Sequence, residues 1–247
     1  MQDVAIIVGG GPGISASCAR LFIDEGMKVA VAARNIGKPV LQSLASDKGV
    51  LLITCDAADA VSVAEMFATV KTDLGNPTLV VHNIDGRTAA VFGKSISDVA
   101  PEAFMTTLQN STYSAFLVGQ QATIHLLNNN MSDNGKGSII FTNASAAIRG
   151  FSKSGAFAAA CHGKAGLAQS MARELMPQGI HVVNVPMDGA IGVTQDDGTR
   201  KHWLAGADQG DNMLDPDFIA RTYLQLHRQH RSTWTTEVVL RPWLEKW

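Results

Sequence analysis

Short apolar runs alternate with longer segments of helical periodicity along most of the chain. The runs are rich in β-branched residues and nearly continuous, which is typical of strands buried on both faces of a parallel sheet. They predict strands at Val4–Val8, Lys28–Ala33, Val50–Cys55, Leu79–Asn83, Ser138–Thr142 and Ile180–Val185. The intervening segments predict helices at Gly13–Glu25, Lys38–Lys48, Ala60–Leu74, Pro101–Leu127 and Gly155–Met176.

The strict alternation of these elements predicts βαβ units with right-handed crossovers. We therefore expect an α/β fold of the Rossmann type, a doubly wound parallel sheet with helices on both faces. No internal repeat, low-complexity tract or long linker divides the chain. Residues 1–247 are accordingly expected to form a single domain.

The last part of the chain has a different pattern. Gly189–Asn212 holds five glycines and little periodicity, which predicts a long loop. Loops of this length often cover a binding site, so we expect a substrate loop at 189–212, with His202 and Trp203 as candidate contacts. Asp215 and Pro216 then suit the N-cap and first turn of a helix. A final strand is predicted at Thr235–Leu240.

Composition narrows the class of protein. With 46% hydrophobic and 17% charged residues the chain is not a disordered one, and a formal net charge of −2 argues against binding to nucleic acid. The three cysteines, Cys18, Cys55 and Cys161, form neither a disulfide framework nor a metal-binding pattern. No leader peptide and no apolar run of about 18 residues is present, so we expect a cytoplasmic protein without a membrane span.

A glycine-rich turn follows the first predicted strand and opens a helix. Its sequence is Gly9-Gly10-Gly11-Pro12-Gly13-Ile14-Ser15. Glycines permit positive φ and close approach of a ligand, and the helix start offers free N–H groups to a pyrophosphate. A tight turn without a ligand is the alternative, but this position in a βαβ unit favours dinucleotide binding. Gly9, Gly11, Gly13 and Ile14 are the predicted contacts.

The end of the second predicted strand bears on the choice of coenzyme. An acidic residue there would bind the ribose 2′-hydroxyl of NAD, whereas an arginine can pair with the 2′-phosphate of NADP. The chain has Arg34 at this place and no acid beside it, which favours NADP over NAD. Asp56, after the third strand, could accept a hydrogen bond from the adenine amino group or cap the following turn.

The chain resembles the short-chain dehydrogenase/reductase family over essentially its whole length. The glycine turn is similar to that family's phosphate loop, although Ser15 replaces its last glycine and Val8 its usual threonine. The resemblance implies an adenine contact at Asp56 and a coenzyme-site asparagine at Asn83. It further implies a catalytic asparagine at Asn110, which would hold a proton-relay water, and an active-site lysine at Lys164, which would also bind the nicotinamide ribose.

The two catalytic hydroxyl groups of that family are missing here. In the family a tyrosine stands four residues before the lysine and a serine about thirteen residues before the tyrosine. These positions hold Ala160 and Ala147, and the alternative spacing of seven residues falls on Phe157. A phenol with a pKa near 10 needs a nearby ammonium to transfer protons at neutral pH, so Lys164 has lost its partner. Ser145 is the candidate replacement that could approach a carbonyl group, or it could instead bind the backbone.

Two hypotheses of function follow. The first is an NADP-dependent oxidoreductase acting on a small carbonyl compound or alcohol, in which Asp188 beside the nicotinamide is a candidate acid or amide-orienting group. The second is a catalytically impaired dinucleotide-binding protein with a regulatory or structural role. The resemblance implies a homodimer or homotetramer. Of the two tyrosines, Tyr113 lies one turn after Asn110, and Tyr223 is predicted to be structural.

Overall fold

The central element of the fold is a six-stranded parallel sheet. The computed structural model describes residues 2–195, 197–202 and 204–245. The strands are β1 (Val4–Val8), β2 (Lys28–Ala33), β3 (Leu51–Thr54), β4 (Leu79–His82), β5 (Gly137–Ala144) and β6 (Ile180–Met187), in the order β3-β2-β1-β4-β5-β6. All neighbours pair in parallel, and the order reverses between β1 and β4. The predicted Rossmann-type doubly wound sheet is therefore confirmed.

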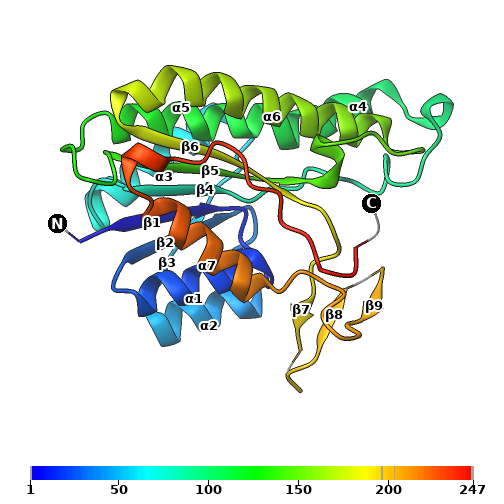
Figure 1. Ribbon diagram of the computed structural model, residues 1–247, viewed down its shortest axis with the longest axis horizontal. Helices are drawn as coiled ribbons and strands as arrows, with labels where there is room; N and C mark the ends of the chain where they lie inside the picture. The colour runs from blue at the N-terminus through cyan, green and yellow to red at the C-terminus, as the bar shows by residue number, and fades with distance from the viewer. Residues whose placement is uncertain (1, 196, 203, 246–247) are drawn as a thin grey trace.

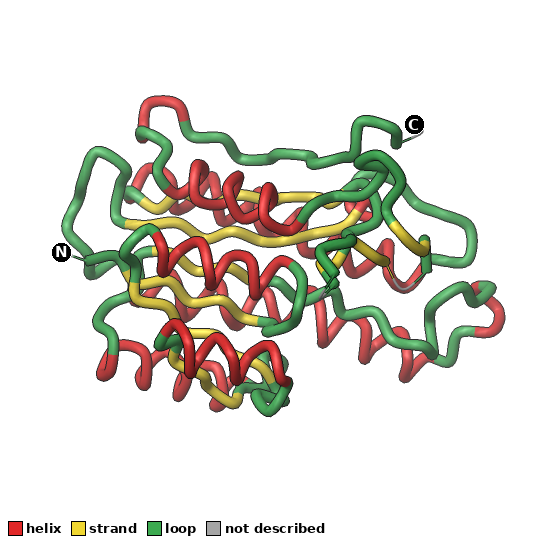
Figure 2. Tube along the Cα trace, turned by 90° about the horizontal axis from the view of Figure 1, so that it is seen from below, coloured by secondary structure: helices red, strands yellow, loops and turns green. Residues whose placement is uncertain are grey.

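Helices cover both faces of this sheet (Figures 1 and 2). One face carries α1 (Ile14–Asp24), α2 (Pro39–Lys48) and α7 (Pro216–His227). The opposite face carries α3 (Ala60–Asp73), α4 (Pro101–Leu108), α5 (Ser114–Leu126) and α6 (Gly155–Leu175). Short 3-10 turns lie at Ile96–Asp98, Ser145–Ala147, Met176–Gln178 and Arg231–Thr233. Each face of the sheet thus has its own apolar core, as the nearly continuous apolar strands predict.

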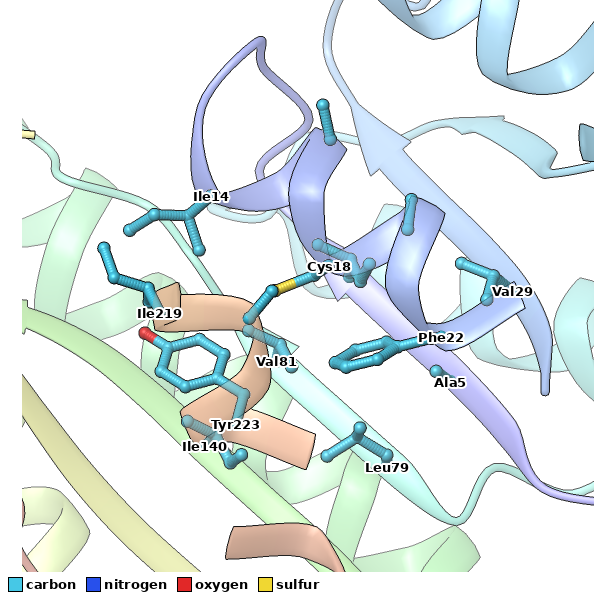
Figure 3. Packing of buried hydrophobic residues seen from close by; sticks show 14 of the residues in the cluster. Ala5, Ile14, Cys18, Phe22, Val29, Leu79, Val81, Ile140, Ile219 and Tyr223 are labelled. Carbon is cyan, nitrogen blue, oxygen red and sulfur yellow. The ribbon is translucent and has the colours of Figure 1, made fainter. Parts of the chain in front are cut away.

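Tyr223 belongs to one of these cores and not to the site. In Figure 3 its ring lies among apolar side chains from α1, α7 and the sheet, including Ile219 and Ile140. Its hydroxyl group is 2.7 Å from the hydroxyl of Thr142, and burial raises the pKa of the phenol well above its ordinary value. The expected structural role of Tyr223 agrees with this position.

The helix predicted at Pro101–Leu127 is interrupted. Gln109–Tyr113 forms a π-helical turn between α4 and α5. The hydroxyl group of Ser114 donates to the carbonyl of Asn110 at 2.7 Å, which competes with regular α-helical hydrogen bonds. π-Helical turns are frequent at functional sites, and this one contains Asn110.

The region predicted as a long loop contains a small antiparallel sheet. Its strands are β7 (Val193–Thr194), β8 (Arg200–His202) and β9 (Gly206–Ala207), and we call it the lid sheet. Arg200 organises it by bonding to three carboxylates, those of Asp208, Asp211 and Asp215. The three short strands within the predicted loop were not foreseen, because strands of two or three residues are too short to show an alternating pattern.

The predicted last strand, Thr235–Leu240, is only partly regular. It runs parallel to β6 and pairs with it at two separate bridges, Asn184 with Glu237 and Met187 with Leu240. The N–H of Val238 donates to the carbonyl of Asn184 at 3.1 Å. Among the described residues, no helix combines the length and the hydrophobicity needed to cross a bilayer.

Candidate functional site

Two neighbouring cavities lie at the carboxyl ends of the strands, where a doubly wound sheet binds its ligands. The nucleotide cavity, about 450 Å³, lies between the glycine turn and the ends of β2 and β3. The inner cavity, about 520 Å³, lies between the glycine turn, the ends of β5 and β6, and the lid sheet. Residues 83–85 and Arg87 line both cavities. Together they form a continuous candidate site for a dinucleotide and a small second ligand.

The glycine turn has one position, Gly9, at which the backbone requires glycine, and another, Gly11, beside which there is open space. Gly9 has a φ of +107°, and a Cβ atom there would lie 2.3 Å from the carbonyl oxygen of Asn83. Gly11 lines the inner cavity, and a Cβ atom there would meet no atom within 4 Å. Gly13 is the N-cap of α1, and no side chain caps that helix. The free N–H groups at the start of α1 are therefore open to a phosphate, as the sequence predicts.

Ser15 and Asn83 brace the glycine turn. The amide of Asn83 donates to the hydroxyl of Ser15 at 2.7 Å, and that hydroxyl donates to the carbonyl of Gly9 at 2.7 Å. The side chain of Ile14 is buried beside them and lines the inner cavity. Ser15, which the sequence comparison marks only as a departure from the family pattern, thus links the turn to the end of β4.

Two cations and one carboxylate line the outer part of the nucleotide cavity. Arg34 is exposed at the end of β2, where the sequence places it. Lys38 lies near it and donates to the carbonyl of Gly10 at 2.6 Å. Asp56 accepts from the N–H of Ala58 at 3.0 Å, so the turn-capping role is observed, and the residue also lines the cavity. Sequence reasoning missed Lys38, although its closeness to Arg34 is visible in the chain.

Lys164 projects from α6 toward the ends of β4 and β5. Its ammonium group donates to the carbonyl of Ile84 at 2.8 Å and to that of Thr142 at 3.2 Å. The side chain is fully buried, and desolvation lowers the pKa of Lys164 to about 8. Lys164 is one of the residues that line the inner cavity.

Asn110 and Ser145 lie on different cavities. Ser145 follows β5 directly and shares the inner cavity with Lys164. Asn110 lines the neighbouring nucleotide cavity. The structure thus brings Ser145 and Lys164 together and places Asn110 across the wall that the two cavities share.

No tyrosine hydroxyl lines either cavity in the part of the chain that the structure describes. Ala160 is completely buried. Tyr113 is 44% exposed and stacks on Phe116, away from the site. Phe157 does line the inner cavity, and the guanidinium group of Arg87 lies 4.5 Å from its ring centre. The absence of the expected phenol is therefore a feature of the folded site as well as of the sequence.

Asp188 does not occupy the place expected from the sequence. Its carboxylate is buried and bonds to Arg149 at 3.0 Å and to Arg241 at 2.8 Å. It is absent from the walls of both cavities, whereas its neighbours Met187 and Gly189 line the inner cavity. Both carboxylate oxygens hold a guanidinium group, so the observed contacts of Asp188 are those of a buried ion pair and include none of the expected acid or amide-orienting kind. Asp188 instead joins the end of β6 to the C-terminal segment.

His202 ends β8 and forms part of the lid-sheet wall of the inner cavity. Its Nδ1 atom accepts the N–H groups of Leu204 at 3.3 Å and Ala205 at 3.1 Å. Burial, and secondarily the charge of Arg87, lower the pKa of His202. The other predicted lid contact, Trp203, lies outside the described residues, as does Trp247. No cluster of three or more metal-ligating side chains occurs among residues 2–195, 197–202 and 204–245.

Comparison with known proteins shows which family the chain is similar to. Residues 9–240 match the family model described as enoyl-(acyl carrier protein) reductase. The 3-oxoacyl-[acyl-carrier-protein] reductase MabA of Mycobacterium tuberculosis is 29% identical over 186 residues, which are 75% of this chain and 68% of that protein. The (+)-borneol dehydrogenase 1 of Salvia officinalis is 30% identical over 210 residues, covering 82% of this chain and 76% of its own.

A solved structure extends the similarity to the whole fold. The short-chain dehydrogenase from Rhodopseudomonas palustris superposes with a TM-score of 0.74 at 26% identity. The match covers 98% of this chain and all of that one. With the family match over most of its length, the chain belongs to the short-chain dehydrogenase/reductase family of oxidoreductases.

Proposed function

We propose that this protein is an NADP-dependent oxidoreductase that interconverts a small carbonyl compound and its alcohol. The observation that carries the proposal is the pair of joined cavities at the switch point of the sheet. The glycine turn lines both cavities, Arg34 and Asp56 line the nucleotide cavity, and Ser145 and Lys164 line the inner cavity. Together they suit a dinucleotide that extends from the nucleotide cavity into the inner cavity, where a small substrate would meet it.

The glycine turn fits a pyrophosphate because its open backbone leaves room for one. The empty space beside Gly11 and the uncapped start of α1 would receive the phosphates. Asp56 would contact the adenine, while Asn83, Ile14 and the ammonium group of Lys164 would hold the nicotinamide half. When bound, the coenzyme supplies the reducing equivalent, and the protein supplies orientation and electrostatics.

We infer a preference for NADP from the charges at the end of β2. Arg34 and Lys38 both line the nucleotide cavity there, and no carboxylate follows β2 directly. A guanidinium group pairs with a phosphate through two parallel hydrogen bonds, and the nearby ammonium group adds a second positive charge. The same pair would gain nothing from the neutral 2′-hydroxyl group of NAD.

The inner cavity supports carbonyl chemistry with fewer groups than the family uses. Ser145 would donate a hydrogen bond to the substrate oxygen, and Lys164 would place positive charge beside it. Asn110 would hold a water molecule on the other side of the shared wall. A positioned proton donor typically contributes about 10²–10⁴-fold to a rate, so turnover without the tyrosine is expected to be slow.

A second candidate function is NADP binding without turnover. The side chains of Ala160, which is buried, and of Ala147 favour it, because a methyl group cannot donate a proton. Under this hypothesis the occupied coenzyme site would stabilise an assembly or regulate a partner protein.

We infer that the protein forms a homodimer or homotetramer. Large apolar side chains are exposed together along α4, the π-helical turn and α5: Met105, Tyr113, Phe116 and Ile124. A second copy of the chain would cover them. Light scattering coupled to size-exclusion chromatography tests this inference, and a monomer at micromolar concentration would contradict it.

Two measurements test the proposed function. At 100 times its Kd, NADPH should stabilise the fold by about 2.7 kcal/mol and raise the Tm, whereas NADH at the same concentration should do so less. NADPH oxidation with a panel of aldehydes and ketones, 4-nitrobenzaldehyde among them, should be slow but dependent on Lys164. If neither NADPH nor NADH raises the Tm, both the oxidoreductase function and the binding function are overturned. If NADPH raises the Tm but no compound of the panel is turned over, only the binding function is supported.

A further inference from the structure

A third cavity adjoins the inner cavity, and we call it the side cavity. It has a volume of about 180 Å³ and lies between the loop that follows β4 and the start of α6, with described walls that include Arg87, Phe92, Lys153 and Phe157. Arg87 and Phe157 line the inner cavity as well, so the two cavities share a wall. A small group on a ligand of the inner cavity could therefore extend into the side cavity.

The guanidinium group of Arg87 lies where these two cavities meet. Its Nε atom donates to a carboxylate oxygen of Asp85 at 2.8 Å, and Asp85 lines the inner cavity. Its Cζ atom lies 4.5 Å from the centre of the Phe157 ring, which both cavities share, and 5.8 Å from the centre of the Phe92 ring in the side cavity. These contacts place the charged end of the side chain, and not only its stem, between the walls of both cavities.

Both Nη atoms of Arg87 are open to a ligand. Among the residues whose structure is described, neither Nη atom makes a hydrogen bond, whereas Nε is held by Asp85. A guanidinium group that is anchored at one edge and stacked on an aromatic ring loses little further freedom when it binds. The end of this planar fork suits a carboxylate, which accepts two parallel hydrogen bonds from it.

Positive charge exceeds negative charge on the described walls of the two cavities. Arg87, Lys153 and Lys164 line them, against the single carboxylate of Asp85. We have assigned the phosphates of the coenzyme to the glycine turn and to the end of β2. Lys153 lines neither the nucleotide cavity nor the inner cavity, so the coenzyme does not account for it. An anionic group on the second ligand would account for the charge of both Arg87 and Lys153.

Resting on the proposed oxidoreductase function, we propose that the substrate is a carbonyl compound that carries a carboxylate group and that Arg87 binds this carboxylate. The carbonyl group would lie in the inner cavity, which Ser145 and Lys164 line, and the carboxylate would point toward the side cavity. Ile191 and Val193 also line the inner cavity, and such apolar walls suit a short hydrocarbon or aromatic body between the two groups. Arg87 is thus the specificity-determining residue for an aldehyde acid or a keto acid.

Pairs of an aldehyde acid and its neutral methyl ester test this assignment. 4-Formylbenzoate and succinic semialdehyde, each with its methyl ester, place the carboxylate at different distances from the carbonyl group. For at least one pair we expect the wild-type kcat/KM of the acid to exceed that of the ester about 10–100-fold, because the ester cannot make the charged hydrogen bonds. This acid-to-ester ratio should fall to near one in Arg87→Gln. The control Arg173→Gln, which changes an exposed arginine on α6, should keep the wild-type ratio.

Asp85→Asn separates ligand binding from a structural role of the ion pair. If Asp85 and Arg87 only fix the loop that follows β4, loss of either charge weakens the same contact, and the acid-to-ester ratio should change in the same direction in both variants. If Arg87 binds a carboxylate, Asp85→Asn removes a competing carboxylate while the new amide oxygen can still accept from Nε. The ratio should then rise, by up to about fivefold, in contrast to its fall in Arg87→Gln. A ratio that falls in both variants, or that stays at the wild-type value in Arg87→Gln, overturns the proposal.

A binding measurement does not depend on turnover. Isothermal titration of the NADPH-loaded protein with the two product alcohols, 4-(hydroxymethyl)benzoate and 4-hydroxybutyrate, should give for at least one of them a Kd about 10–100-fold higher in Arg87→Gln than in the wild type. If the wild type reduces no compound but binds such an acid through Arg87, the oxidoreductase function fails and the carboxylate site stands. If it reduces neutral carbonyl compounds but the Kd for both acids is the same in both proteins, the carboxylate site fails and the oxidoreductase function stands. If Arg87→Gln raises the Kd for NADPH and not that for the acids, Arg87 belongs to the coenzyme site and the proposal is overturned.

Discussion

The ammonium group of Lys164 lies 2.8 Å from the carbonyl oxygen of Ile84, so a buried cation on α6 holds the segment that follows β4. Its second partner, the carbonyl of Thr142, belongs to β5. Both partners are neutral backbone groups, and the cost of burying the charge is therefore not offset by a paired carboxylate. The buried ammonium group of Lys164 thus lies where we propose that the nicotinamide ribose binds.

This burial predicts an unusual dependence of stability on pH. Desolvation lowers the pKa of Lys164 from 10.5 to about 8, so between these values the unfolded chain binds more protons than the folded one. The contribution of Lys164 to the free energy of unfolding should therefore increase with pH across this window, by at most about 1.4 kcal/mol per pH unit. Urea unfolding of the wild type and of Lys164→Met from pH 7 to 10 measures it. Because the two proteins share every other titrating group, a constant difference between them would contradict the prediction.

Substitutions in the glycine turn should separate folding from coenzyme binding. In Gly11→Ala the added methyl group meets no protein atom, so we expect a wild-type Tm in the absence of coenzyme. The same methyl group would occupy space that we assign to the pyrophosphate, and the Kd for NADPH should rise at least about tenfold, which corresponds to 1.4 kcal/mol. Thermal shift titration with NADPH measures both quantities.

Gly9→Ala is the contrasting variant. Its methyl group would lie 2.3 Å from the carbonyl oxygen of Asn83 at a φ of +107°, so the loss should be in the free energy of unfolding. Equal loss of stability in both variants would show that Gly11 serves the fold and not a ligand.

The parts of the fold that the sequence predicts are those with a repeating local signal. β1 and β2 are continuous apolar runs because both faces of the sheet are covered, and the helices between them have the period of an amphipathic segment. β8 has three residues, which is too few for any period. The π-helical turn depends on hydrogen bonds of Ser114 to the backbone, which no pattern of apolar residues records.

Some residues of the candidate site could be predicted from the sequence and others could not, for the same reason. The glycine turn and Arg34 were predictable because each follows a strand directly, so position along the chain determines position in space. The partners of Asp188 were not, because Arg149 and Arg241 are 39 and 53 residues away and meet it only after folding.

Arg34→Ala should change the choice of coenzyme. The guanidinium group lines the nucleotide cavity, and a hydrogen bond between charged groups contributes about 1.5–3 kcal/mol. We expect the Kd for NADPH to rise about 10–100-fold while the Kd for NADH stays nearly constant. Fluorescence titration with both coenzymes measures the ratio. The control is Arg173→Ala, which removes an exposed arginine on α6. If Arg34→Ala raises the Kd for NADPH and the Kd for NADH by the same factor, the assignment of Arg34 to the 2′-phosphate is overturned.

Asp188→Asn tests the structural role that replaces the expected catalytic one. The substitution leaves Arg149 and Arg241 facing a neutral amide in a buried setting. Breaking a fully buried ion pair costs about 3–5 kcal/mol, and because both arginines are partly exposed we expect a smaller loss, about 2–4 kcal/mol. Asp24→Asn removes an exposed pair with Lys48 and should cost less than about 1 kcal/mol. Urea unfolding measures both losses. If Asp188 only holds the C-terminal segment in place, NADPH should still raise the Tm of Asp188→Asn. If the variant is as stable as the wild type but no longer binds NADPH, Asp188 belongs to the coenzyme site.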